Sequence, residues 1–169
     1  MIKERHRHCK GIFRGEFPGG ANQGRKGTVG LWYTDGIAMN DDEMRAMLIE
    51  YMGKGFLENI IAMMKQDPSA MRFIPDLLGD DVLLVRLGAT ALVEDLAKEH
   101  RRALAGAVPG LIALLGHENP TIRGDAANAL GIIGSRSALQ ALKRLLQDGN
   151  PSVREIAQDS MKEIEAGRE

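Results

Sequence analysis

The chain has 169 residues, enough for one domain or for a domain with an appendage. Apolar residues make up 44% and aromatic residues only 4%, so we expect a globular fold with an aliphatic core. The one cysteine, Cys9, excludes an internal disulfide framework and favours a reducing compartment. The longest stretch of low polarity, residues 103–116, is too short to cross a membrane, and no apolar segment of a secretory signal follows the charged start. We therefore expect a cytoplasmic protein with no membrane contact.

The first 38 residues differ in composition from the rest of the chain. Residues 1–38 hold seven Lys/Arg against three Asp/Glu and eight of the twenty glycines, whereas residues 39–169 hold 15 Lys/Arg against 20 Asp/Glu. This predicts a basic, Gly-rich arm (1–38), irregular or with a short hairpin at 28–36, before a folded domain (39–169). Met39 stands just before the first capped helix, so it is an alternative start of the chain.

From residue 40 onward, apolar residues recur at helical spacing between capping and breaking residues. The first helix opens with Asn40 and three acidic residues, and Asp67-Pro68 ends the second. About eight helices are expected, over residues 40–52, 56–66, 69–78, 81–100, 107–115, 120–133, 137–147 and 151–165.

Two stretches of the chain are nearly the same. LLGHENPTIRGDAANALGIIG (114–134) and LLQDGNPSVREIAQDSMKEIE (145–165) share paired leucines, Asn-Pro, a β-branched residue, Arg, and Ala three residues later. A third copy aligns on Arg86. Around each Arg, the apolar residues form one stripe that a single helix pair cannot bury, whereas stacked pairs can. The small residue of the pattern, Ala126 in the best-formed copy, allows two helices to approach closely.

These residues resemble the HEAT-repeat family. Its pattern of Val-Arg-x-x-Ala-x-x-Ala-Leu-Gly-x-Ile-Gly is matched by residues 122–134, and the resemblance covers residues 74–165, with 40–66 as a degenerate first repeat. It implies an all-α solenoid, a superhelical stack of three to four helix pairs. Within the family, the residues most resemble the bacterial HEAT-like type that is also found in phycobilin lyase subunits.

In that family the turn Asp and the Arg bond within and between repeats as a ladder. The resemblance therefore gives structural roles to a set of charged residues. They are Arg86, Arg123, Arg154, Asp80 and Asp148. His117 stands where the other repeats have Asp, so the chain departs from the pattern at this rung.

No residue pattern indicates catalysis, a cofactor or a metal. His6, His8 and Cys9 are isolated in the basic arm, without the paired spacing of a structural zinc site. The HEAT-like deoxyhypusine hydroxylases need several His-Glu pairs, and this chain has one, His117-Glu118. The basic cluster at 98–102 ends a helix, where it complements the helix dipole, so nucleic acid is not an expected partner.

Solenoids bind their partners on the concave face. If the second helix of each pair lines it, the exposed positions form a small surface with apolar and acidic side chains. The residues expected there are Leu87, Ala91, Glu94, Asn128, Glu155 and Asp159. We expect a non-enzymatic protein–protein interaction module, an adaptor or assembly factor for an unidentified protein. The alternative is a phycobilin-lyase-like subunit or accessory.

Overall fold

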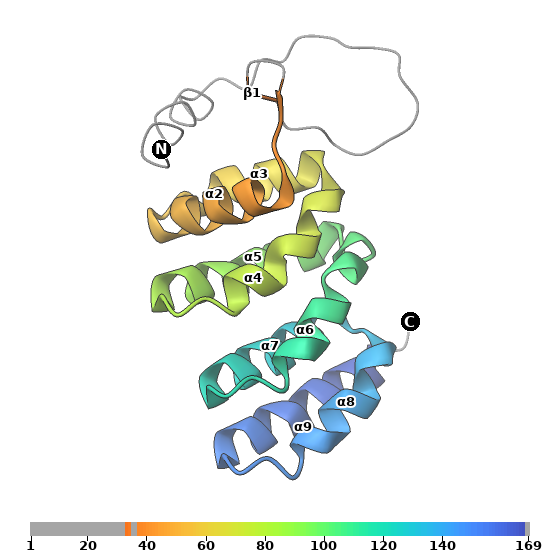
Figure 1. Ribbon diagram of the computed structural model, residues 1–169. Helices are drawn as coiled ribbons and strands as arrows, with labels where there is room; N and C mark the ends of the chain where they lie inside the picture. Colours follow the sequence, from red (N-terminus) through yellow and green to blue (C-terminus); the bar gives the residue numbers. More distant parts are fainter. Residues whose placement is uncertain (1–32, 35–36, 168–169) are drawn as a thin grey trace.

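A computed structural model describes residues 33–34 and 37–167, and this part of the chain forms four helix pairs stacked along one axis (Figure 1). The elements in chain order are α2 (Asp41–Gly53), α3 (Leu57–Gln66), the 3-10 helix η2 (Pro68–Phe73), α4 (Ile74–Leu78), α5 (Leu83–Glu99), the 3-10 helix η3 (Ala103–Gly106), α6 (Val108–Leu114), α7 (Pro120–Ile133), the 3-10 helix η4 (Arg136–Ala138), α8 (Leu139–Leu145) and α9 (Pro151–Ala166). The expected all-α solenoid is confirmed.

Two short strands precede the stack. Strand β1 (Tyr33–Thr34) pairs antiparallel with β2 (Ile37–Ala38), and Tyr33 lies opposite Ala38. From the sequence, residues 1–38 were expected to be either irregular or to contain a short hairpin at 28–36. The rest of residues 1–38, with His6, His8 and Cys9, lies outside the described residues, so the division into an arm and a repeat domain stays a prediction.

Asparagine side chains set the start of three helices. Asn40 and Glu43 form a capping box at α2, in which each side chain bonds the backbone of the other residue. Asn119 caps α7 and Asn150 caps α9, and each is followed by proline at the first helical position. The missing N–H of proline is harmless there, because the first turn has no internal acceptor for it. The Asn-Pro pair thus ends the turn and begins the second helix of a pair.

The first α-helices of the second, third and fourth pairs are shorter than the sequence indicates. The helix expected over 69–78 is a 3-10 helix that continues into the five-residue α4, with Pro75 in its first turn. The connection after α5 contains the 3-10 helix η3, and a 3-10 turn also precedes α8. Apolar periodicity locates these segments but does not distinguish a 3-10 turn from an α turn over so few residues.

The core is continuous from the first pair to the last and is built of aliphatic and methionine side chains. Leu48, Met64, Leu77, Leu92 and Leu130 are among its fully buried members. Aromatic side chains are few, in agreement with the composition, so methionines fill the irregular spaces of the first pair.

The second helices form one continuous layer of the stack (Figure 1). Helix α3 packs against α5, α5 against α7 and α7 against α9, with the most extensive contact at the last step. The first helices form the other layer, in which η2 also packs against η3.

A glycine allows the closest of these contacts. A Cβ atom on Gly131 of α7 would lie 2.9 Å from both Cα and Cβ of Ser160 on α9. Ser160 is itself buried, and its backbone cannot turn away as a flexible side chain could. The approach of α7 to α9 therefore requires glycine at this position.

We predict that Gly131→Ala lowers the free energy of unfolding by about 1–3 kcal/mol, the usual range for overpacking. This loss outweighs the gain of up to about 1 kcal/mol in helix propensity from replacing glycine. Urea unfolding followed by circular dichroism measures the change. Gly106→Ala is the control, because a Cβ there has no atom within 4 Å. An equal effect of both substitutions would contradict the close contact.

Candidate partner-binding surface

The three aligned arginines make the same backbone contacts. In each, Nη1 donates to the carbonyl oxygens six and five residues earlier, in the turn between the two helices of the pair. The distances are 2.8 and 3.1 Å for Arg86 to Asp80 and Asp81, 2.8 and 3.0 Å for Arg123 to His117 and Glu118, and 2.7 and 3.4 Å for Arg154 to Asp148 and Gly149. The guanidinium thus ties the second helix to the turn before it.

In each of the three turns, a side chain accepts a hydrogen bond from the backbone N–H two residues later. Asp80 Oδ1 accepts from the N–H of Val82 at 2.8 Å, and Asp148 Oδ1 accepts from the N–H of Asn150 at 2.8 Å. In the third pair, His117 Nδ1 accepts from the N–H of Asn119 at 3.1 Å. Histidine therefore replaces aspartate in shaping the turn.

Of the three aligned arginines, all within the described residues, Arg123 forms a close ion pair with the turn of the following repeat. Arg123 donates from Nε and Nη2 to the two carboxylate oxygens of Asp148, at 2.8 and 2.7 Å, and the side chains are 17% and 10% exposed. This bidentate contact lowers the pKa of Asp148 and raises that of Arg123. It joins the third pair to the fourth.

The corresponding contact between the second and third pairs is different. His117 offers no carboxylate to Arg86, and the acid near this guanidinium is Asp125 on α7, with Nε 3.3 Å from Oδ2. Within the described residues, Nε of Arg86 makes no hydrogen bond, although Arg86 is buried. Burial raises the pKa of Asp125, and Arg86 opposes this only in part. This junction is therefore electrostatically weaker than that between the third and fourth pairs.

The residues expected to bind a partner all lie on second helices. Leu87 and Glu94 are exposed on α5 with the half-buried Ala91 between them, and Asn128 is half-buried on α7. Glu155 and Asp159 are exposed on α9. The structure brings the three α5 residues together on one helix face.

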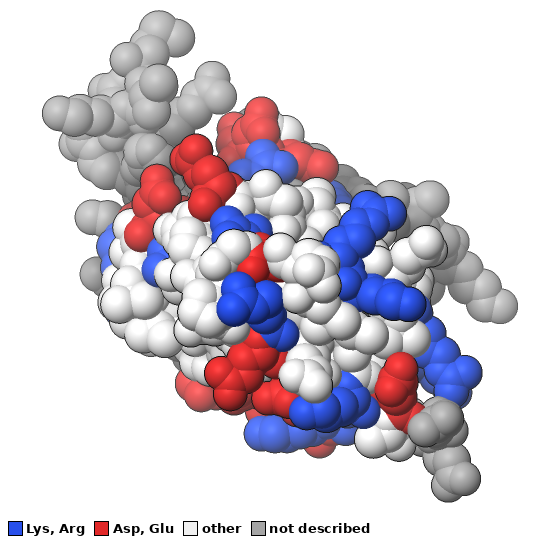
Figure 2. All heavy atoms as spheres, turned by 90° about the horizontal axis from the view of Figure 1, so that it is seen from below, with Lys and Arg blue, Asp and Glu red and all other residues white. Residues whose placement is uncertain are grey.

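The two α9 residues lie toward the free end of the stack. Glu155 occupies the position on α9 that Gly124 occupies on α7, and a Cβ on Gly124 would contact Ile156 of the next helix. Figure 2 shows this end of the solenoid, where acidic and basic side chains are interspersed among uncharged ones. Glu155 and Asp159 thus lie on the last second helix of the stack, apart from the α5 residues.

Three further exposed residues were missed by the sequence reasoning. Val82, Leu83 and Leu84 are 53%, 58% and 53% exposed, and Leu87 is 58% exposed on the next turn of α5. The signal that finds them is the comparison with the Asn-Pro-Thr and Asn-Pro-Ser of the other repeats, which the alignment on Arg already contained.

Comparison with known proteins agrees with the repeat geometry. Residues 89–162 match the family model of HEAT repeats. This part of the chain is similar to HEAT repeats. Proteins built from such repeats generally mediate protein–protein interactions, and the fold is typically a non-enzymatic scaffold. No match to the sequence was found among curated proteins.

Two engineered proteins of known structure are similar to this chain. One, solved by crystallography, is 21% identical with a TM-score of 0.50, and the match covers 76% of this chain and 58% of that one. A designed armadillo repeat protein is 20% identical with a TM-score of 0.44, over 74% of this chain and 59% of that one. This chain therefore spans less than two thirds of either, and the first likeness shows the fold alone.

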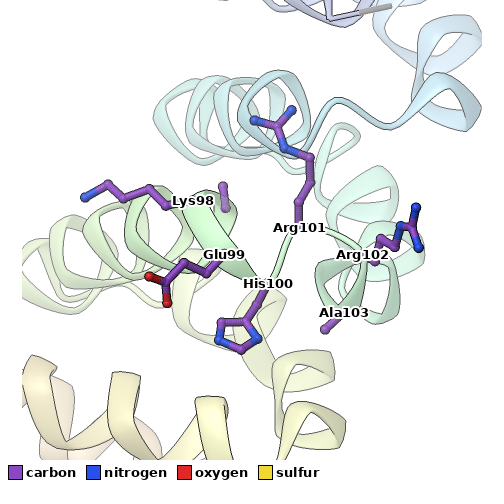
Figure 3. A pocket seen from close by; sticks show the side chains of 7 residues that line it. Lys98, Glu99, His100, Arg101, Arg102 and Ala103 are labelled. Atoms are coloured by element: carbon purple, nitrogen blue, oxygen red, sulfur yellow. The ribbon is translucent and has the colours of Figure 1, made fainter. Parts of the chain in front are cut away.

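The basic cluster of the solenoid lines an open hollow of about 500 Å³ between α5 and η3. Figure 3 shows that Lys98, His100, Arg101 and Arg102 point in different directions and not toward one centre. Arg101 reaches the end of α7, where Nη1 would lie 3.0 Å from a Cβ on Gly134. A guanidinium at a helix C-terminus is favourable to the helix dipole, so this contact has a structural explanation.

Among the residues that the structure describes, no group of three His, Cys, Asp or Glu could hold a metal ion. No helix among them is long and apolar enough to span a bilayer.

We predict that Asp148→Asn lowers the free energy of unfolding by about 1–3 kcal/mol at neutral pH, the range for charged hydrogen bonds. The folded pKa of Asp148 lies below its unfolded value. Its stabilisation is therefore present above the unfolded pKa, near 3.9, and is lost as the pH falls through the folded pKa. Urea unfolding from pH 7 to pH 2 should show the difference between wild type and variant shrinking toward acid.

The control for this substitution is Asp80→Asn. Asp80 accepts the same turn bond, and among the described residues it has no ion pair. Its replacement should change stability less and with little dependence on pH. A pH-independent difference for Asp148→Asn would contradict the role of the ion pair.

Proposed function

We propose that this chain is a non-enzymatic interaction module, an adaptor or assembly factor that binds a segment of another protein on its concave side. The observation that carries the proposal is the exposed face of α5, where Leu87, Ala91 and Glu94 follow one another in the layer of second helices. Exposed aliphatic side chains beside carboxylates are suited to a protein segment, because they offer both contact area and charge complementarity.

The charge of this layer favours a basic partner. In the layer of second helices, Lys65 of α3 lies 2.9 Å from Asp95 of α5, so this lysine is neutralised locally. Glu94 and Glu155 have no ion pair within the described part of the chain, and residues 39–169 carry five more acids than bases. A partner segment with Lys or Arg beside an aliphatic residue would fit. The same excess of acids disfavours nucleic acid, whose phosphates require a basic surface.

No observation on the described residues favours the phycobilin-lyase alternative over protein binding. The hollow beside η3 is lined by charged side chains, whereas pigment sites are mostly apolar and enclosing.

We predict that charge reversal at Glu155 and Asp159 to Lys weakens the binding of the natural partner several-fold. Removing the attraction slows association, so higher salt should reproduce the effect in the wild-type protein. The partner would be identified by affinity purification with mass spectrometry, and its association and dissociation rates measured by surface plasmon resonance.

The control reverses Asp42 and Glu165, which changes the net charge equally at exposed positions on α2 and at the last turn of α9. Circular dichroism checks that both variants fold, since exposed substitutions usually change stability by about 0.5 kcal/mol or less. Unchanged partner affinity in the folded Glu155/Asp159 variant would exclude α9 from the binding surface and limit that surface to the α5 residues.

A further inference from the structure

The second helix pair breaks the rule that the third and fourth pairs follow at the start of their second helices. Residues 119–121 are Asn-Pro-Thr and residues 150–152 are Asn-Pro-Ser, whereas residues 82–84 are Val-Leu-Leu. All three segments occupy the same place, between the turn and the buried residue before the arginine. The Asn-Pro-Thr or Asn-Pro-Ser of the third and fourth pairs is thus replaced by three apolar residues in the second pair.

The backbone does not require this replacement. The cap residue has φ and ψ of −77° and 114° at Val82, −75° and 117° at Asn119, and −90° and 123° at Asn150. Asn119 and Asn150 accept hydrogen bonds from the backbone N–H two residues later, and Val82 makes no such bond. Asparagine would therefore fit at position 82 and would cap α5 better than valine.

The core does not require the replacement either. Val85 carries the buried position of the repeat at the start of α5, while Leu83 and Leu84 point into solvent. Together with Val82 and Leu87 they make up four of the five large apolar side chains that are exposed in the described part of the chain. Such a local break with the repeat, without a gain inside the fold, is expected where a surface serves binding.

We infer that Val82, Leu83, Leu84 and Leu87, named here the α5 stripe, bind the apolar face of a basic amphipathic helix from a partner protein. This rests on the proposed function and specifies the partner of that site. The stripe continues through Ala91 to Glu94, about 17 Å along α5 at 1.5 Å per residue, which is three turns of a bound helix.

Acids stand at both ends of the α5 stripe. Asp81 is exposed just before it, and Glu94 is exposed just after it. The nearest bases offer little opposing charge: Arg86 is buried against the turn carbonyls, and Lys54 pairs with Glu50. Lys98, further along α5, lies 3.6 Å from Asp95. A helix with leucines at i, i+3, i+4 and i+7 and with lysines in its terminal turns therefore complements this surface.

A second copy of the chain fits the stripe less well. Antiparallel pairing of two stripes would place Asp81 of one copy beside Glu94 of the other, and parallel pairing would place like residues together, so both bring carboxylates into contact. The stripe is also small. It exposes on the order of 400 Å², against about 800 Å² on each partner of a stable interface between folded proteins.

The test gives α5 of the full chain the same Asn-Pro-Thr start that α7 has. The triple variant Val82→Asn, Leu83→Pro, Leu84→Thr removes three members of the stripe and supplies the Asn-Pro-Thr start found at 119–121. The extended ψ of residue 82 suits a following proline. We expect its melting temperature to equal or exceed that of the wild type, so that loss of binding cannot be attributed to unfolding.

The probe is a fluorescein-labelled helical peptide of about 16 residues with the leucine and lysine pattern given above. Two control peptides are used. One carries glutamates in place of the lysines, and the other has the same residues in scrambled order. Fluorescence anisotropy should show binding of the first peptide to the wild type, with at least about tenfold weaker binding of both control peptides. The triple variant should bind the first peptide at least about tenfold more weakly than the wild type.

Each other result overturns the inference. No binding of the first peptide, or equal binding by the wild type and the triple variant, would exclude a basic helix on the α5 stripe. A dimer of the wild type that the triple variant abolishes in analytical ultracentrifugation would make a second copy the occupant. The Glu155/Asp159 reversal, measured with the natural partner, tests the proposed function separately, because that variant leaves the α5 stripe intact.

Discussion

The stack depends on an arginine that makes contacts in two directions. Its Nη1 satisfies two carbonyls of the turn behind it in all three repeats, and in Arg123 the other nitrogens bind the carboxylate of Asp148 in the next turn. Only a planar guanidinium offers donors in both directions at once, and a lysine could not replace it. The orientation of a helix relative to its own turn and to the next pair is thereby fixed by one side chain.

The junctions of the third pair with the second and with the fourth show what happens when the acid of this contact changes. At α7 and α9 the acid is present, and glycines at 124 and 131 let the helices approach closely. At α5 and α7 the turn has His117, the nearby acid is Asp125, and the helices make less extensive contact. The stack is therefore not uniform, and its electrostatically weaker junction lies between the second and third pairs.

The period of the sequence predicted the fold because the buried stripe repeats with the arginine, and a stripe must find an equal neighbour. It did not predict that Asp125 would face Arg86. This pairing depends on the rotation of α7 against α5, which no local pattern encodes. Nor did it predict the 3-10 turns before α4 and α8, which are too short for a period to appear. The exposure of Val82 was not predicted, because an apolar residue such as valine is expected in the core. Comparison with Asn119 and Asn150, at the same position of the repeat, would have shown that this position faces solvent.

The weaker junction and the α5 stripe have a common origin in the sequence. Leu87 and Glu94 stand on α5 at the positions that Gly124 and Gly131 hold on α7. Glycine at these positions allows the next helix to cover the face, whereas a leucine and a glutamate occupy that space with their own side chains and remain exposed. The same two departures from the repeat thus keep α7 from closing over α5 and supply the apolar and acidic groups that the opening presents. Each repeat of a solenoid normally covers the apolar face of its neighbour. A face that stays uncovered at a junction is therefore available to a segment of another chain.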